Sequence, residues 1–427
     1  MTQRAGTHAR DTHRAVDAVW RIESARVVGG LTRLVRDVGL AEELAQDALV
    51  AALEQWPQTG IPNNPGAWLM AVGKRRAIDL IRRRERLDRK IDELGRDLET
   101  ATDDEFDAAV EETIDDDILR LVFISCHPVL STDARVALTL RVLGGLRTEE
   151  IARAFLVPEP TVAQRIVRAK KTLADARVPF EVPQGAERDA RLASVLEVIY
   201  LIFNEGYSAT AGDDWLRPAL CDEALRLGRV LAGLAPREPE VHGLVALMEI
   251  QASRSAARVG PSGEPVLLLD QDRSRWDRIL IGRGLAALER AEALGGLGPY
   301  AIQAAIAACH ARATTAEATN WGRIAALYQV LARVQPSPVV ELNRAVAVAM
   351  ADGAGAGLEI VDRLVEEPTL KDYHLLPSVR GDLLFKLHRY AEARVEFERA
   401  ASMTRNAREQ ALLRDRAIES AERLTDR

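Results

Sequence analysis

The sequence predicts an all-α protein. The chain is rich in the helix formers Ala, Leu, Arg and Glu, whereas Phe, Trp and Tyr, which favour strands, make up only 4% of its 427 residues. Apolar residues recur at the i, i+3 and i+4 spacing of helices along most of the chain. One short run typical of a strand, Val266–Leu269, is flanked by loop residues. At about 100–200 residues per domain, this length corresponds to about three domains.

Three helices are predicted in the first domain, at residues 10–87. The first covers about 12–38 and ends at Gly39, because glycine is common just after a helix. The second helix is closed by Pro57, and Pro65 suits the first turn of the third. The apolar faces of the last two helices comprise Leu44, Leu49, Leu53 and Trp56, then Leu69, Val72, Ile78 and Ile81.

Four more helices and two linkers are predicted before residue 188. An acidic, self-repelling linker at 88–114 precedes a second domain at 115–177, and a Pro-containing linker at 178–187 follows it. The helices of the second domain are predicted at 115–126, 132–143, 148–155 and 159–174. Residues 188–427 alternate Ala/Leu-rich helical runs with short Gly/Pro breaks, which indicates a third, helical domain.

The net charge of −7 conceals segments of strong and opposite charge. Residues 74–90 carry nine basic and three acidic side chains, net +6, and residues 92–117 carry thirteen acidic and one basic, net −12. Residues 161–177 carry five basic and one acidic side chain, net +4. The overall acidity therefore does not exclude nucleic acid as a partner, because basic side chains concentrated on a helix can contact phosphates.

Residues 148–173 have the pattern of a helix-turn-helix. Thr148 supplies a cap oxygen, acids follow it in the first turn, and Ile151, Ala152 and Phe155 face inward. Leu156–Pro158 forms a short turn before the second helix. The core face of that helix comprises Val162, Ile166, Ala169 and Leu173. The opposite face carries the candidate DNA-binding residues Gln164, Arg165, Arg168 and Lys171.

The sequence indicates neither an enzyme nor a metal site. Three scattered cysteines, Cys126, Cys221 and Cys309, suit buried reduced thiols, and no cofactor is predicted. The glycines that start at Gly353 lack the preceding strand of a dinucleotide-binding loop. With no apolar run of eighteen residues and no apolar signal core at the N-terminus, we expect a cytoplasmic protein without membrane contact.

Together, three motifs resemble the bacterial extracytoplasmic-function (ECF) sigma factors. They are Glu43-Leu-Ala-Gln-Asp-Ala-Leu-Val, the segment from Pro65 to Arg84 that contains Trp68-Leu-Met-Ala-Val-Gly-Lys-Arg-Arg-Ala-Ile-Asp, and the helix-turn-helix. The resemblance covers about 12–175. It implies that Glu43, Gln46 and Asp47 bind the β′ coiled coil of RNA polymerase core, and that the helix-turn-helix domain reads the −35 element and binds the β flap.

For the −10 element the resemblance implies a second set of DNA-binding residues, Lys74, Arg75, Arg76, Asp79, Arg82 and Arg83. Lys74-Arg75 stands where the family usually has Arg-Asn, which puts the promoter sequence in doubt but not the class. Trp68 is expected in the core beside Leu69 and Val72 rather than stacked on a base. The two elements lie about 70 Å apart. A neutral coil as long as the 27-residue linker spans only about 30 Å, so the acidic linker must be stretched.

The C-terminal region resembles tetratricopeptide repeats. Gly381, Tyr390, Ala393, Phe397 and Ala400 occupy the packing positions of that pattern, and residues 338–365 form a weaker copy. Leu201-Ile-Phe-Asn-Glu-Gly-Tyr and Asn320-Trp321 are similar to the ECF group that carries such an extension. The resemblance implies regulation by this tail, whose stacked helices would bind a protein or peptide partner.

Two other functions are compatible with the same residues. One is a helix-turn-helix regulator that binds duplex DNA without polymerase and whose tail senses a ligand. The other is a helical-repeat scaffold whose basic helices are incidental. A transcription assay with a defined promoter, core polymerase and this protein distinguishes these two functions from that of a sigma factor.

Overall fold

The computed structural model describes residues 2–92, 114–209, 211–212, 216–261, 263–296 and 298–425. Its α-helices confirm the all-α prediction. The chain divides into two compact units, Met1–Ile199 and Tyr200–Arg427, and the boundary falls within helix α8. The helices up to this boundary are α1 (Thr2–Val35), α2 (Val38–Thr59), α3 (Pro65–Asp92), α4 (Ile114–Ser125), α5 (Thr132–Val142), α6 (Thr148–Phe155), α7 (Glu159–Asp175) and α8 (Gly185–Tyr207).

The break between α1 and α2 lies at Arg36, so the predicted stop at Gly39 is wrong. Arg36 takes the left-handed conformation (φ 53°) that usually ends a helix at glycine. Asp37 then caps α2, because its Oδ1 accepts a hydrogen bond from the Leu40 N–H at 2.9 Å. Pro57 does not close α2 either. It lies in the last turn, and the helix continues to Thr59 before Gly60 at φ 83°.

The helix-turn-helix has the predicted bounds within one residue. Leu156, at φ 50°, makes the turn, and Val162, Ile166, Ala169 and Leu173 are all buried as predicted. Two details differ from the prediction: Phe155 is only half-buried, and Thr148 is the first helical residue rather than the cap. The cap is Arg147, whose backbone N–H donates to Glu150 Oε2 at 2.8 Å.

Both predicted linkers are shorter than expected at one end. Helix α3 extends to Asp92, five residues into the predicted acidic linker, and α8 begins at Gly185, inside the predicted 178–187 linker. Residues 93–113 of the acidic linker lie outside the described residues. The predicted behaviour of that linker therefore stays a prediction.

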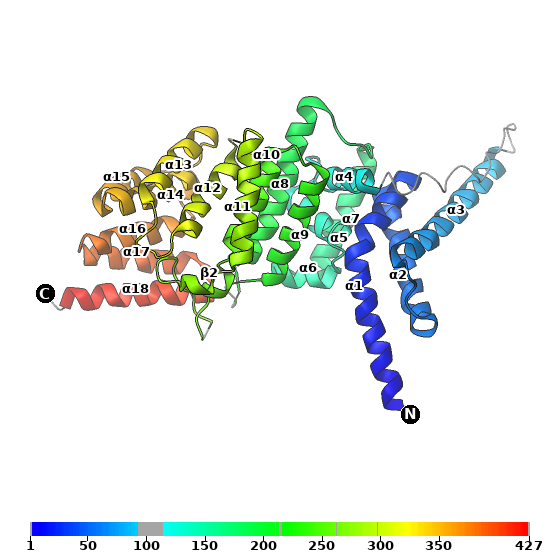
Figure 1. Ribbon diagram of the computed structural model, residues 1–427, viewed down its shortest axis with the longest axis horizontal. Coiled ribbons are helices and arrows are strands. Elements are labelled where there is room, and N and C mark those ends of the chain that lie inside the picture. The colour runs from blue at the N-terminus through cyan, green and yellow to red at the C-terminus, as the bar shows by residue number, and fades with distance from the viewer. Residues whose placement is uncertain are drawn as a thin grey trace. The chain divides into compact units, whose positions relative to one another are not determined.

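The second unit is a series of packed helices, and Figure 1 shows α14 to α18 stacked side by side. Its α-helices are α9 (Pro218–Leu234), α10 (Pro239–Ala252), α11 (Arg278–Ala293), α12 (Pro299–Arg312), α13 (Trp321–Val334), α14 (Pro338–Asp352), α15 (Ala354–Leu364), α16 (Leu375–Lys386), α17 (Tyr390–Met403) and α18 (Ala407–Thr425). Short 3-10 helices cover Ser255–Ala257, Arg273–Arg275 and Pro368–Leu370.

The segment that resembles a tetratricopeptide repeat forms the helix pair α16–α17. A Cβ added at Gly381 would lie 3.0 Å from the Phe397 ring, so only a small residue lets the two helices approach this closely. Phe397, Ala393 and Ala400 are buried in the same apolar cluster. The pair is thus built as expected, and its membership of that repeat family stays a prediction.

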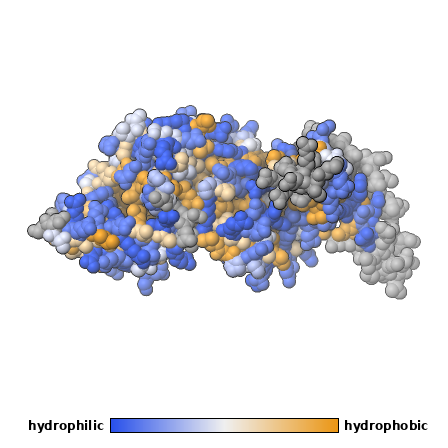
Figure 2. Space-filling model, turned by 90° about the horizontal axis from the view of Figure 1, so that it is seen from below, coloured by the Kyte–Doolittle hydropathy of each residue, from blue (hydrophilic) through white to orange (hydrophobic). Residues whose placement is uncertain are grey.

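A two-stranded parallel pairing is a small exception to the helical architecture. Strand β1 (Ala211–Gly212) pairs with β2 (Arg405–Asn406), and the Asn406 side-chain amide donates to the Ala209 carbonyl at 3.1 Å. The strand-like run Val266–Leu269, which loop residues flank, forms no strand. Within the described residues no helix is both long and apolar enough to cross a membrane. The face drawn in Figure 2 is mostly hydrophilic, with apolar residues in small groups.

The three cysteines are free and buried, as predicted. Burial raises the pKa of Cys126 to about 11 and that of Cys221 to about 12. Thiols with such pKa values remain protonated at neutral pH, so they act as small apolar groups of the core rather than as nucleophiles.

His310 makes the stability of the second unit depend on pH. Burial, and then the neighbouring Arg254 and Arg273, lower its pKa from 6.5 to about 4. Between these values the unfolded chain binds the proton and the folded chain does not. We therefore expect the unit to lose stability as pH falls from about 6.5 to 4, by at most roughly 3 kcal/mol. Urea denaturation at several pH values, compared with His310→Gln, measures this contribution; equal pH slopes would contradict it.

Candidate nucleic-acid interface

Helix α7 presents a polar face to solvent. Gln164, Arg168 and Lys171 are exposed and lie opposite the buried stripe of the helix. Arg165 lies at the edge of this face, where its guanidinium pairs with Asp133 Oδ2 at 2.8 Å and is one-third exposed. The structure therefore brings three of the four predicted −35 residues together and directs the fourth toward α5.

Helix α3 carries the second basic face. Arg75, Asp79, Arg82 and Arg83 are exposed, whereas Leu69 and Ala77 on the opposite side are buried. Lys74 and Arg76 flank this face and are half-buried. Trp68, predicted in the core, is only half-buried; it packs edge-on against Trp56, with ring centroids 5.3 Å apart.

The predicted polymerase-binding residues lie on α2, next to α3. Glu43 and Asp47 are exposed one turn apart, and Gln46 between them is half-buried. Asp47 Oδ2 pairs with Arg76 Nη1 at 2.8 Å. This pair joins a predicted polymerase contact to a predicted −10 contact, a link that the sequence alone did not reveal.

A buried carboxylate, Glu42, connects α2 to the helix-turn-helix. Its side chain is only 6% exposed, and it accepts from Arg141 Nε at 2.8 Å and from Lys170 Nζ at 2.5 Å. Arg141 belongs to α5 and Lys170 to α7. Sequence reasoning missed this network, although a glutamate beside the apolar stripe Ala41, Ala45 and Ala48 signals a buried partner.

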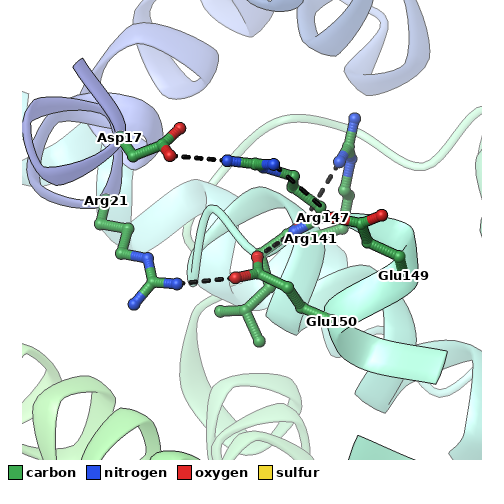
Figure 3. Close-up of polar contacts among 7 residues, drawn as sticks. Asp17, Arg21, Arg141, Arg147, Glu149 and Glu150 are labelled. Carbon is green, nitrogen blue, oxygen red and sulfur yellow. Dashed lines mark hydrogen bonds and ion pairs between the residues drawn. The ribbon is translucent and has the colours of Figure 1, made fainter. Parts of the chain in front are cut away.

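Further ion pairs join α1 to the start of α4 and to the helix-turn-helix. In Figure 3, Arg147 points to Asp17 and Arg21 points to Glu150, with distances of 2.7 and 2.8 Å. The hydrogen bond to Asp17 is the main reason why the pKa of Arg147 is raised. The buried Asp117 forms ion pairs with Arg33 and Arg120, yet burial raises its pKa.

Chemically, the interface offers cations and hydrogen-bond donors rather than a reactive centre. Two exposed basic faces, on α3 and α7, suit contacts to phosphates and base edges. Among the described residues, no group of His, Cys, Asp and Glu side chains is arranged to hold a metal ion.

Three protein-family models match the chain. Sigma-70 region 2 matches residues 21–87, and Sigma-70, region 4 matches residues 120–173. A family of unknown function (DUF6596) matches residues 191–292. The first two matches cover α3 as far as residue 87 and α7 as far as residue 173, the two helices that carry the basic faces.

Whole-sequence comparison gives relatives of two kinds. An uncharacterized protein of Rhizobium meliloti is 47% identical over 390 residues, which cover 91% of this chain and 92% of that protein. The probable ECF RNA polymerase sigma factor SigI of Mycobacterium tuberculosis is 29% identical over 41% of this chain and 60% of its own length. The ECF RNA polymerase sigma factor SigK of a Mycobacterium species is 28% identical, over 36% of this chain and 77% of that protein.

Removing the Glu42 charge is expected to destabilise the first unit strongly. In Glu42→Gln, Arg141 and Lys170 stay mostly buried without their carboxylate, which costs about 3 kcal/mol or more. Urea denaturation gives the change in unfolding free energy, and hydrogen exchange locates it in α2, α5 and α7. Asp47→Asn on the same helix removes the exposed pair with Arg76 and should cost less than about 1 kcal/mol. Equal losses in the two variants would contradict the assigned role of Glu42.

Proposed function

Because the chain belongs to the ECF sigma factors and carries a C-terminal extension, we propose that it directs RNA polymerase core to bipartite promoters under the control of that extension. We call the matched residues 21–87 and 120–173 the two sigma-like segments. The observation that supports the proposal most strongly is that each segment has a helix with an exposed basic face and a buried opposite side. Sigma factors are not enzymes, so the chemistry of transcription belongs to the polymerase.

The −35 element is assigned to α7. Gln164, Arg168 and Lys171 are free of the core and would reach base edges and phosphates in the major groove. Val167 lies on the same side and is 63% exposed, which suits an apolar contact with a thymine methyl group. Arg165 would have to leave Asp133 to reach DNA, so it contributes less than its charge suggests.

The −10 element is assigned to α3, through Lys74, Arg75, Arg76, Asp79, Arg82 and Arg83. The exposed arginines of this set supply cations along one face, which suits a nucleic-acid backbone. Polymerase binding is assigned to Glu43, Gln46 and Asp47 against the β′ coiled coil, and the helix-turn-helix to the β flap. Since Asp47 pairs with Arg76, contact of Asp47 with polymerase would release Arg76 for DNA.

Promoter binding would require the two sigma-like segments to separate. The Glu42–Lys170 contact holds α7 directly against α2. Promoter elements two DNA turns apart lie about 70 Å from each other. One protein cannot keep this contact and read both elements, so the ion pairs described above would break when the promoter complex forms.

The C-terminal helices are assigned a regulatory role. They form a separate compact unit, and stacked helix pairs present a surface suited to a protein or peptide partner. Because this unit is fused to the sigma-like segments, it would control promoter use in the cytoplasm, where the polymerase is.

Loss of an exposed α7 cation should reduce promoter use. Arg168→Ala removes a guanidinium that has no role in the core, and one base contact is worth about 1–3 kcal/mol, which corresponds to a loss of roughly 5-fold to 150-fold in promoter-specific transcription. The assay combines the full chain, core polymerase and a promoter selected from a random pool. Arg153→Ala on α6, also an exposed arginine, is the matched control. Unchanged initiation by Arg168→Ala would overturn the −35 assignment, and no initiation by the wild-type chain would overturn the proposed function.

Removal of the C-terminal unit should alter this activity. A chain that ends after α8, without residues 208–427, keeps both sigma-like segments. We expect its promoter-specific transcription to differ from that of the full chain by at least threefold when circular dichroism shows equal folding of the first unit. Equal transcription by the two chains would contradict regulation by the extension.

A further inference from the structure

A cleft of about 700 Å³ opens between the two sigma-like segments, within the first unit. It is lined by the end of α1, the start of α2, α4, the end of α7 and residues 178–181. This volume is within the range of small-molecule sites, about 300–1,000 Å³.

The cleft is basic. Five cationic side chains line it, against the two carboxylates Asp37 and Glu181: Arg33, Arg36, Arg120, Lys170 and Arg177. Asp117 faces two of these cations, Glu42 faces Lys170, and Asp37 is engaged as the cap of α2. Among the described residues, no carboxylate forms an ion pair with Arg36 or Arg177. These two guanidinium groups therefore remain available to an anion from solution.

The backbone gives no reason for arginine at either position. Arg36 has φ 53° and Arg177 has φ 48°, the left-handed conformation that glycine adopts without cost and other residues adopt at a cost. Each arginine also follows the last turn of a helix, where a cation is favourable. Anion binding and stabilisation of a helix end make different predictions for a glycine variant. Such a variant keeps the backbone conformation and removes the guanidinium.

Part of the lining is apolar. Ile124 and Leu173 are buried, and the Phe180 ring is half-buried in the segment that follows α7. An aromatic ring beside aliphatic side chains suits a flat heterocycle, while guanidinium groups match phosphate oxygens in geometry and charge.

We propose that this cleft binds a phosphorylated small molecule of the nucleotide class. Arg36 and Arg177 bind its phosphates, and Phe180 contacts its ring. Because the cleft is lined from both sigma-like segments, the bound molecule holds α7 against α1 and α2. The binding itself does not depend on the proposed function, because it is measured without polymerase or DNA.

The first test measures binding of three probes to the full chain by isothermal titration calorimetry at about 0.15 M salt. We expect saturable one-to-one binding of ATP, weaker binding of pyrophosphate and none of adenosine. Phe180→Ala should weaken the binding of ATP and leave the binding of pyrophosphate unchanged. Absence of saturable ATP binding, or equal binding of ATP and adenosine, would overturn the proposal.

The second test uses Arg36→Gly and Arg177→Gly, with Leu156→Gly as the matched control. Leu156 also has a left-handed backbone, φ 50°, but does not line the cleft. We expect each arginine variant to lose at least about tenfold in ATP affinity at unchanged thermal stability, and the control to bind as the wild type does. Arginine variants that lose thermal stability but bind ATP normally would show that these residues only cap α1 and α7. Variants that lose affinity for duplex DNA but not for ATP would assign the cleft to DNA; either result would overturn the proposal.

Discussion

The burial of the Glu42 carboxylate is the constraint on which the first unit depends. A charge that is 6% exposed must be compensated, and its two cations come from α5 and α7, about 100 and 130 residues away in the chain. Once Lys170 is directed inward to Glu42, the helical period places Gln164, Arg168 and Lys171 on the outer face of α7. Lys170 also lines the basic cleft.

Several of the contacts that join the two sigma-like segments are ion pairs, and this matters for function. Exposed pairs such as Asp17–Arg147 and Arg21–Glu150 are each worth about 0–1 kcal/mol and weaken with salt. Ion pairs can be exchanged for phosphates or polymerase side chains, whereas a broad apolar interface has no such substitute in solution. The Glu42 network fixes how the two sigma-like segments pack together, and the exposed ion pairs adjust how strongly they associate.

In the second unit, too, an arginine satisfies buried polar groups inside a helical core. Arg273, buried beside Trp276, donates to the carbonyls of His310 and Ala313 at the end of α12 and to the Thr319 hydroxyl. It thereby satisfies carbonyls that a helix end leaves without partners. Burial, and then the charges of Arg254 and Arg273, lower the pKa of the neighbouring His310 and keep it neutral.

The sequence by itself determined the helical class, the bounds of α6 and α7 within one residue, and the polar faces of α3 and α7, because helical periodicity and turn chemistry are local. It misplaced the stops at Gly39 and Pro57, since Arg36 accepts the backbone conformation expected of glycine and a proline is tolerated in a last turn. Only the tertiary structure decided that Asp47 pairs with Arg76, that Arg165 pairs with Asp133 and that Glu42 is buried. Such partners are chosen by how helices pack, and the pattern along one helix contains no information about which residue of another helix will face it.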